Sequence, residues 1–177
     1  DTSLVLGRFQ SAQPEHVERA VKAARAAQKG WAKRPWQERV GILRNAARLI
    51  RERKLELAAV MSIEVGKNRM ESMGDAEESA DLVDYYCQQV VDAAGFVRRM
   101  DELTPIETNT DVLRPYGVFA CVAPFNFPAA LAFGMSSAAL VTGNAVVFKP
   151  ATDTPWTGLK VFEIYRDAGV PAGVINF

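Results

Sequence analysis

The sequence contains few residues of the kinds that bind metals or form disulfides. Its 177 residues include two cysteines, Cys87 and Cys121, and one histidine, His16. The cysteines lie far apart without CxxC spacing, so we expect no zinc site, no other metal and no disulfide framework. Such cysteine usage favours a reducing, cytoplasmic compartment. His16 has no partner ligands nearby, and we expect it at the surface near a helix start.

Neither sign of charge is in surplus. Lys plus Arg and Asp plus Glu both count 21, which gives a formal net charge of zero. Nucleic acids and anionic membranes attract an excess of positive charge, so neither is an expected partner. The polar start Asp1-Thr2-Ser3 predicts no signal peptide. The longest apolar run, 127–141, is shorter than the ~18 residues that a membrane span needs.

Helical periodicity dominates the first half of the chain. Apolar residues recur at helical spacing, which predicts four helices at about 14–29, 37–53, 55–66 and 70–95. Pro14 suits a first helical position. On the fourth helix, Glu71, Asp75 and Asp81 lie opposite the apolar stripe. We therefore interpret these three carboxylates as a solvated face.

From residue 116 the pattern changes to continuous apolar runs. Such runs are typical of strands buried on both faces, and they predict parallel strands at about 117–122, 145–149 and 173–177. Helices are expected between them, one opening at Pro128 and one at Pro155 with Thr154 as its N-cap. Alternating strands and helices form a parallel sheet with right-handed crossovers.

The sequence therefore predicts an α/β fold in three parts. Residues 1–97 form a helical segment of the cofactor-binding domain. Residues 98–115 break the periodicity and form an extended connection of the kind used in oligomerisation. Residues 116–177 form the first βαβαβ unit of a Rossmann-like parallel sheet.

Two polar side chains follow neighbouring strands at the edge where ligands collect in parallel sheets. Asn126 follows the first strand and Lys149 ends the second, so an amide and an ammonium group are expected at one rim. Taken alone, Asn126 is typical of a turn and Lys149 of a solvated strand end. No Gly-rich phosphate loop follows the first strand, so the usual dinucleotide fingerprint is absent.

Five motifs in order resemble the aldehyde dehydrogenase superfamily. Three lie around the predicted strands, and the interval from Asn126 to Lys149 (149 − 126 = 23) matches the family's. Glu64-Val65-Gly66-Lys67 resembles the family's helical E-x-G-K motif. The other segments are 114–118 with 123–128, 139–150, and 168–176. The resemblance covers nearly the whole chain and implies the incomplete aldehyde dehydrogenase fold, an aldehyde substrate and a homo-oligomer.

The resemblance also implies roles for particular residues. Asn126 corresponds to the amide that holds the substrate oxygen, and Lys149 to the lysine that bonds the adenosine ribose. The segment that runs along the cofactor corresponds to Val122, Ala123, Pro124 and Phe125. Thr152 stands where many NAD-preferring relatives carry Glu, so the cofactor is expected to be NAD or NADP.

The resemblance implies oxidation through a cysteine thiohemiacetal and thioester, with the catalytic Cys and Glu beyond this chain. Neither Cys87 nor Cys121 lies in the family's Gln-x-Cys setting, and both are expected in the core.

Features at 116–118 and 161–164, together with Phe125, favour the L-glutamate γ-semialdehyde (1-pyrroline-5-carboxylate) branch. Methylmalonate- and succinate-semialdehyde branches and simple aldehyde oxidisers remain open. The alternative function is a short, non-catalytic relative that binds nucleotide or a sister subunit. An intact mass near 19.4 kDa would favour this alternative.

Overall fold

The structure is a computed structural model that describes residues 3–177. The prediction of no signal peptide, which uses Asp1 and Thr2, therefore lies partly outside the described residues. The elements in chain order are α1 (Pro14–Lys33), α2 (Trp36–Glu52), α3 (Lys54–Val65), α4 (Arg69–Asp92), the 3₁₀ turn η1 (Ala94–Phe96), β1 (Val97–Arg99), β2 (Thr110–Val112), β3 (Val118–Val122), α5 (Ala130–Val141), β4 (Ala145–Lys149), α6 (Pro155–Ala168) and β5 (Ile175–Asn176).

The second half of the chain forms the predicted parallel sheet. The strand order is β3-β4-β5. β3 pairs with β4 in parallel from Val118 opposite Ala145 to Val122 opposite Lys149. β5 joins the other side of β4 in parallel, with Val146 opposite Ile175. The α/β fold class and the parallel pairing are therefore confirmed.

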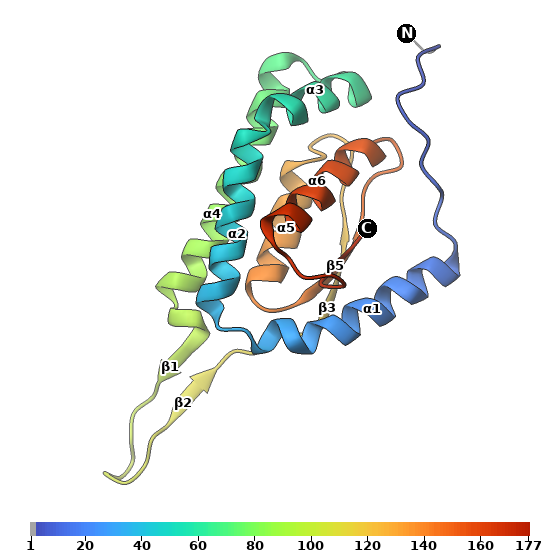
Figure 1. The fold of residues 1–177 in the computed structure, drawn as a ribbon. Helices are drawn as coiled ribbons and strands as arrows, with labels where there is room; N and C mark the ends of the chain where they lie inside the picture. The colour runs from blue at the N-terminus through green and yellow to red at the C-terminus, as the bar shows by residue number, and fades with distance from the viewer. Residues whose placement is uncertain (1–2) are drawn as a thin grey trace.

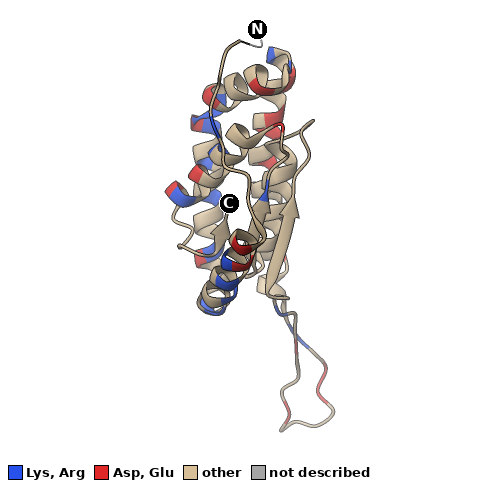
Figure 2. Ribbon diagram, turned by 90° about the vertical axis from the view of Figure 1, so that its right-hand side faces the viewer, with Lys and Arg blue, Asp and Glu red and all other residues tan. Residues whose placement is uncertain are grey.

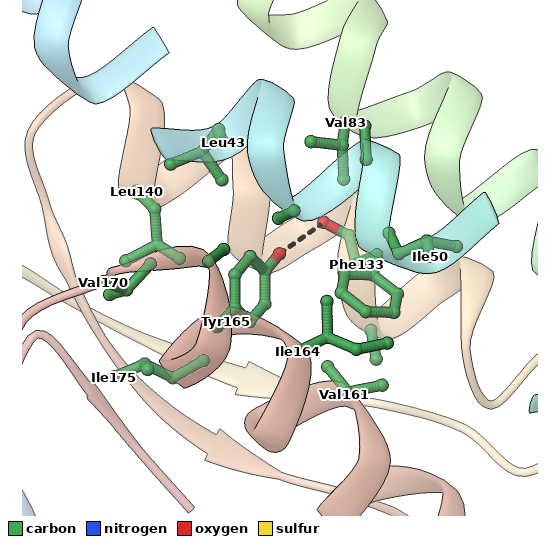
Figure 3. Packing of buried hydrophobic residues seen from close by; sticks show 14 of the residues in the cluster. Leu43, Ile50, Val83, Phe133, Leu140, Val161, Ile164, Tyr165, Val170 and Ile175 are labelled. Carbon is green, nitrogen blue, oxygen red and sulfur yellow. Dashed lines mark hydrogen bonds between the residues drawn. The ribbon is translucent and has the colours of Figure 1, made fainter. Parts of the chain in front are cut away.

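The core lies between two layers of helices. α5 and α6 pack on the sheet, α2 and α4 pack on these two helices, and α1 packs against the strands (Figure 1). Figure 3 shows Phe133 of α5 and Tyr165 of α6 inside the core, and their ring centroids are 5.1 Å apart. The Tyr165 hydroxyl lies 2.7 Å from Ser136 Oγ, so this buried polar group has a partner.

Burial of the strands follows the prediction for β4 and departs from it for β3. Val146 and Phe148 are buried. Phe119 and Val122 of β3 are 39% and 61% exposed, so the prediction of a strand buried on both faces is wrong here. The reason is position: within residues 3–177, β3 is an edge strand with β4 as its one neighbour, so part of it stays uncovered.

The predicted connection between the two halves contains an antiparallel hairpin. α4 ends at Asp92, three residues before its predicted end, and Gly95 then turns the chain with φ +72°. β1 and β2 pair from Val97 opposite Val112 to Arg99 opposite Thr110. This hairpin extends away from the rest of the molecule (Figure 1).

Charged residues gather on the helices and the β1–β2 hairpin, while the strands of the parallel sheet are mainly uncharged (Figure 2). Glu71 and Asp81 of α4 are exposed, as predicted. His16 is partly buried near the start of α1, where its Nδ1 accepts from the Gln13 backbone N–H at 2.9 Å. Among the helices of residues 3–177, none combines the length and the apolarity that crossing a bilayer requires.

Candidate active site

The two segments that carry the predicted site residues meet at one rim of the sheet. Val122 and Lys149 are register partners at the carboxyl ends of β3 and β4. The Ala123 N–H donates to the Lys149 carbonyl at 3.0 Å, which extends the ladder into the loop. The loop that contains Asn126 therefore begins beside Lys149, as the sequence predicts.

The rim presents several of these side chains to solvent. Asn126, Lys149 and Thr152 are exposed, and Phe125 is 55% exposed. Lys149 Nζ donates to the Pro150 carbonyl at 2.7 Å and keeps its other donors available at the surface. The more deeply placed members of the segment are Ala123, which is buried, and Pro124, which is half-buried. An amide, an ammonium group and a hydroxyl thus share one open edge.

The loop between β3 and α5 is held in place by a buried ion pair between Lys67 and Asp75. Lys67 Nζ lies 2.8 Å from Asp75 Oδ2 and donates to the Asn126 carbonyl at 2.9 Å. Asp75 Oδ1 accepts from the Ala130 N–H at 2.7 Å, at the first residue of α5. The Asp75 side chain is 0% exposed. The prediction that Asp75 belongs to a solvated face is therefore wrong, because its carboxylate binds Lys67 and caps α5.

The loop after β4 is held by a second carboxylate, Glu64, which belongs to the same E-x-G-K motif as Lys67. Glu64 accepts from the Trp156 and Thr157 backbone N–H groups at 2.7 and 2.9 Å. Its Oε2 also accepts from Thr157 Oγ1 at 2.6 Å. Thr154 occupies the N-cap position of α6 but makes no side-chain cap hydrogen bond, so its predicted capping role is wrong. Glu64 supplies the acceptor that the helix terminus needs.

The four residues from Glu64 to Lys67 therefore attach both rim loops to the end of α3. Gly66 adopts a left-handed conformation, φ +70°, that ends α3 between Glu64 and Lys67. The N-termini of α5 and α6 are the places where parallel sheets commonly bind phosphate. Asp75 and Glu64 occupy them here, which agrees with the absence of a phosphate-binding loop from the sequence.

Sequence reasoning identified the E-x-G-K motif but not its contacts, and it missed Asp75. The residues around Asp75 in the sequence could have indicated that this part of the helix is packed. Ser72 and Ser79 are small residues one turn away on either side of Asp75, Ala76 is next to it, and all three are buried. Small residues on a helix face allow another segment to approach closely, so this face was a candidate for packing.

Both cysteines are core residues, as predicted. Burial raises the pKa of Cys87 to about 12 and that of Cys121 to about 11. Both thiols stay protonated at neutral pH, so neither is an activated nucleophile. Within residues 3–177, no three His, Cys, Asp or Glu side chains are arranged to hold a metal ion.

The sequence is similar to known enzymes along its whole length. The sequence model of the Aldehyde dehydrogenase family matches residues 1–177. A 1-pyrroline-5-carboxylate dehydrogenase of Geobacillus sp. (strain WCH70) is 40% identical over 173 residues, which are 98% of this chain and 33% of that protein. The enzyme of the same name from Staphylococcus aureus (strain MW2) is 38% identical over 177 residues, covering 100% of this chain and 34% of that protein. The chain thus spans about a third of the length of these relatives.

Solved structures share the fold. A bifunctional proline utilization A (PutA) protein superposes with a TM-score of 0.93 at 33% identity, over 97% of this chain and 17% of that chain. A 3,6-anhydro-L-galactose dehydrogenase in complex with NAP superposes with a TM-score of 0.86 at 34% identity, over 97% of this chain and 36% of that chain. With the family's sequence model matching every residue and the rim loops where the resemblance predicts them, this chain belongs to the aldehyde dehydrogenase family.

Proposed function

We propose that the protein oxidises a semialdehyde to the carboxylate with NAD⁺ or NADP⁺, and that this chain supplies part of the site. The observation that carries the proposal is the meeting of the Asn126 loop and Lys149 at one exposed rim. When bound, the nicotinamide accepts a hydride. The attacking thiolate and the general base are proposed to lie beyond this chain. Burial raises the pKa of Cys87 and of Cys121, so neither thiol suits the role of the nucleophile.

Asn126 is proposed to stabilise the oxyanion of the thiohemiacetal. Attack of a thiolate on an aldehyde places negative charge on the former carbonyl oxygen. An exposed amide at a fixed loop can donate to that oxygen as the charge develops. A single donor of this kind lowers the barrier by about 3 kcal/mol.

The cofactor is proposed to lie along the rim from Val122 to Phe125 towards Lys149. The ammonium of Lys149 has three donors and suits the ribose hydroxyls. Thr152 follows on the same exposed turn and adds an uncharged hydroxyl, which can bond the ribose of either cofactor. No carboxylate stands at position 152 to repel a 2′-phosphate.

The substrate is proposed to be L-glutamate γ-semialdehyde. The named relatives at 38–40% identity, which are 1-pyrroline-5-carboxylate dehydrogenases, support this choice over methylmalonate or succinate semialdehyde. Phe125 and the segment 116–118 supported the same branch from the sequence alone.

The test is a substrate panel with the natural gene product, followed by absorbance of the reduced cofactor. We expect kcat/KM for L-glutamate γ-semialdehyde to exceed that for succinate semialdehyde and for simple aldehydes by about 10-fold or more. Intact mass is measured on the same sample. A mass near 19.4 kDa with no aldehyde oxidation would contradict the proposal and favour the non-catalytic module.

A further inference from the structure

We infer that the buried Lys67–Asp75 ion pair positions Asn126 for catalysis, so that Lys67 and Asp75 are positioning residues of the active site. This inference rests on the proposed function, because it concerns the geometry of the proposed oxyanion donor. Lys67 and Asp75 take no part in the proposed chemical steps, and the inference gives them a role in positioning.

Hydrogen bonds hold the Asn126 loop at three positions: its start, its end and Asn126 itself. At its start, the Ala123 N–H donates to the Lys149 carbonyl at 3.0 Å. At its end, the Ala130 N–H donates to Asp75 at 2.7 Å. Between them, Lys67 Nζ donates to the Asn126 carbonyl at 2.9 Å. The peptide that follows Asn126 is therefore held at its own carbonyl oxygen, which restricts the backbone rotation that aims the Asn126 side chain.

The ammonium of Lys67 also holds the residue after Asn126. Its Nζ lies 3.9 Å from the centroid of the Phe127 ring, a cation–π distance. The side chains of Lys67 and Asp75 are 10% and 0% exposed, so the attraction between these two charges is only weakly screened by solvent. Asp75 in turn anchors the ammonium, and its other oxygen is already used on α5. One ion pair therefore sets the position of α5 and the direction of Asn126 together.

Reactions in preorganised sites lose rate steeply when a donor is displaced. A misplacement of about 1 Å can cost on the order of 100-fold in rate. Loss of the Lys67 contact leaves Asn126 present but less well aimed. We therefore expect a fall in kcat with little change in cofactor binding. Lys149 and Thr152 lie outside this loop, and the 122–125 segment at its start is held separately by the Ala123–Lys149 hydrogen bond.

The test uses the double variant Lys67→Met/Asp75→Asn in the natural gene product. It removes both buried charges together, so no unpaired charge remains in the interior. The amide oxygen at position 75 can still accept from the Ala130 N–H, so the cap of α5 is kept. Asp75→Asn alone is the second variant, because it keeps Lys67 and removes only its anchor. The matched control is Lys160→Met/Glu163→Gln, which neutralises an ion pair of 3.1 Å on α6 and also removes the contact of Lys160 with Glu56, whose side chain is 50% exposed.

We expect the double variant to lower kcat by about 10-fold or more while the KM for the cofactor is retained. The α6 control should keep both constants. The single variant Lys67→Arg should keep most of the wild-type kcat, because a guanidinium can donate to Asp75 and to the Asn126 carbonyl at once. A comparable Tm for the double variant and the α6 control shows that folding does not account for the difference.

A double-mutant cycle with Asn126→Ala separates positioning from general stability. If Lys67 acts only through Asn126, Asn126→Ala lowers kcat by about 100-fold in the wild type and by a clearly smaller factor, about 10-fold or less, in either positioning variant. Equal effects in both backgrounds would overturn the inference and leave the proposed function intact, as would an unchanged kcat in the double variant and in Asp75→Asn. No effect of Asn126→Ala in the wild type would instead overturn the proposed role of Asn126, and this inference with it.

Discussion

Replacing Asn126 by alanine in the natural gene product is expected to lower kcat for aldehyde oxidation by about 100-fold or more. The amide is exposed at the rim, where it can donate to the oxygen that becomes negative when the thiolate attacks. The hydrogen bond strengthens as charge develops, so its loss raises the barrier more than it weakens substrate binding. The measurement is steady-state kcat together with the cofactor Kd, which should stay nearly unchanged.

The matched control for this experiment is Gln37→Ala, which removes an exposed amide from α2. It should leave kcat and cofactor binding at wild-type values. Equal losses of kcat and cofactor affinity in Asn126→Ala would show that the residue supports the loop and does not stabilise the oxyanion.

The substitution Thr152→Glu is expected to shift cofactor preference towards NAD⁺, mainly by weakening NADP⁺. Lys149 ends β4, and its stem can pack while its ammonium reaches the rim beside Thr152. In the proposed cofactor site, a carboxylate at position 152 would stand close to the 2′-phosphate. Two unit charges about 4 Å apart repel by about 4 kcal/mol at an effective dielectric of about 20, an upper figure for so open a rim. The measurement is kcat/KM for each cofactor.

Thr152→Gln is the control, because it adds the same length without charge and should change the preference little. We expect the wild type to accept both cofactors with modest discrimination. A wild type that already rejects NADP⁺ by more than about 1,000-fold, roughly 4 kcal/mol, would show that another residue supplies the discrimination.

The sheet could be predicted because its signals are local. Val146 and Phe148 sit in an apolar run too short for a helix, and the run ends at the charge of Lys149. Parallel pairing then follows from the helix between successive strands. The meeting of Asn126 with Lys149 needs nothing more, since parallel strands end at the same edge.

The support of the rim could not be predicted because its contacts are distant in sequence. Asp75 accepts from Ala130 and Glu64 from Trp156, which are 55 and 92 residues away. Helical periodicity places Asp75 on a polar face and cannot state which later helix will begin there. The same local reasoning predicts Thr154 as the cap of α6, but the carboxylate of Glu64, distant in sequence, accepts from the N–H groups there.

Two other features of the fold, the exposure of β3 and the β1–β2 hairpin, also could not be predicted from the sequence. The apolar run of β3 fits a strand buried on both faces, but edge position leaves Phe119 and Val122 exposed. The β1–β2 hairpin has ten residues between its strands, so it lacks the two-residue turn that marks a hairpin in sequence.

The most direct measurement is a crystal structure of the natural gene product with NAD⁺ bound. We expect Lys149 Nζ within hydrogen-bond distance of a ribose hydroxyl and the Asn126 amide facing the nicotinamide end. A rival location exists in a hollow of about 780 Å³ whose lining includes Arg19, Phe162 and Phe177. Cofactor bound in that hollow, with Lys149 and Asn126 free of contacts to it, would contradict the assignment of the rim as the active site.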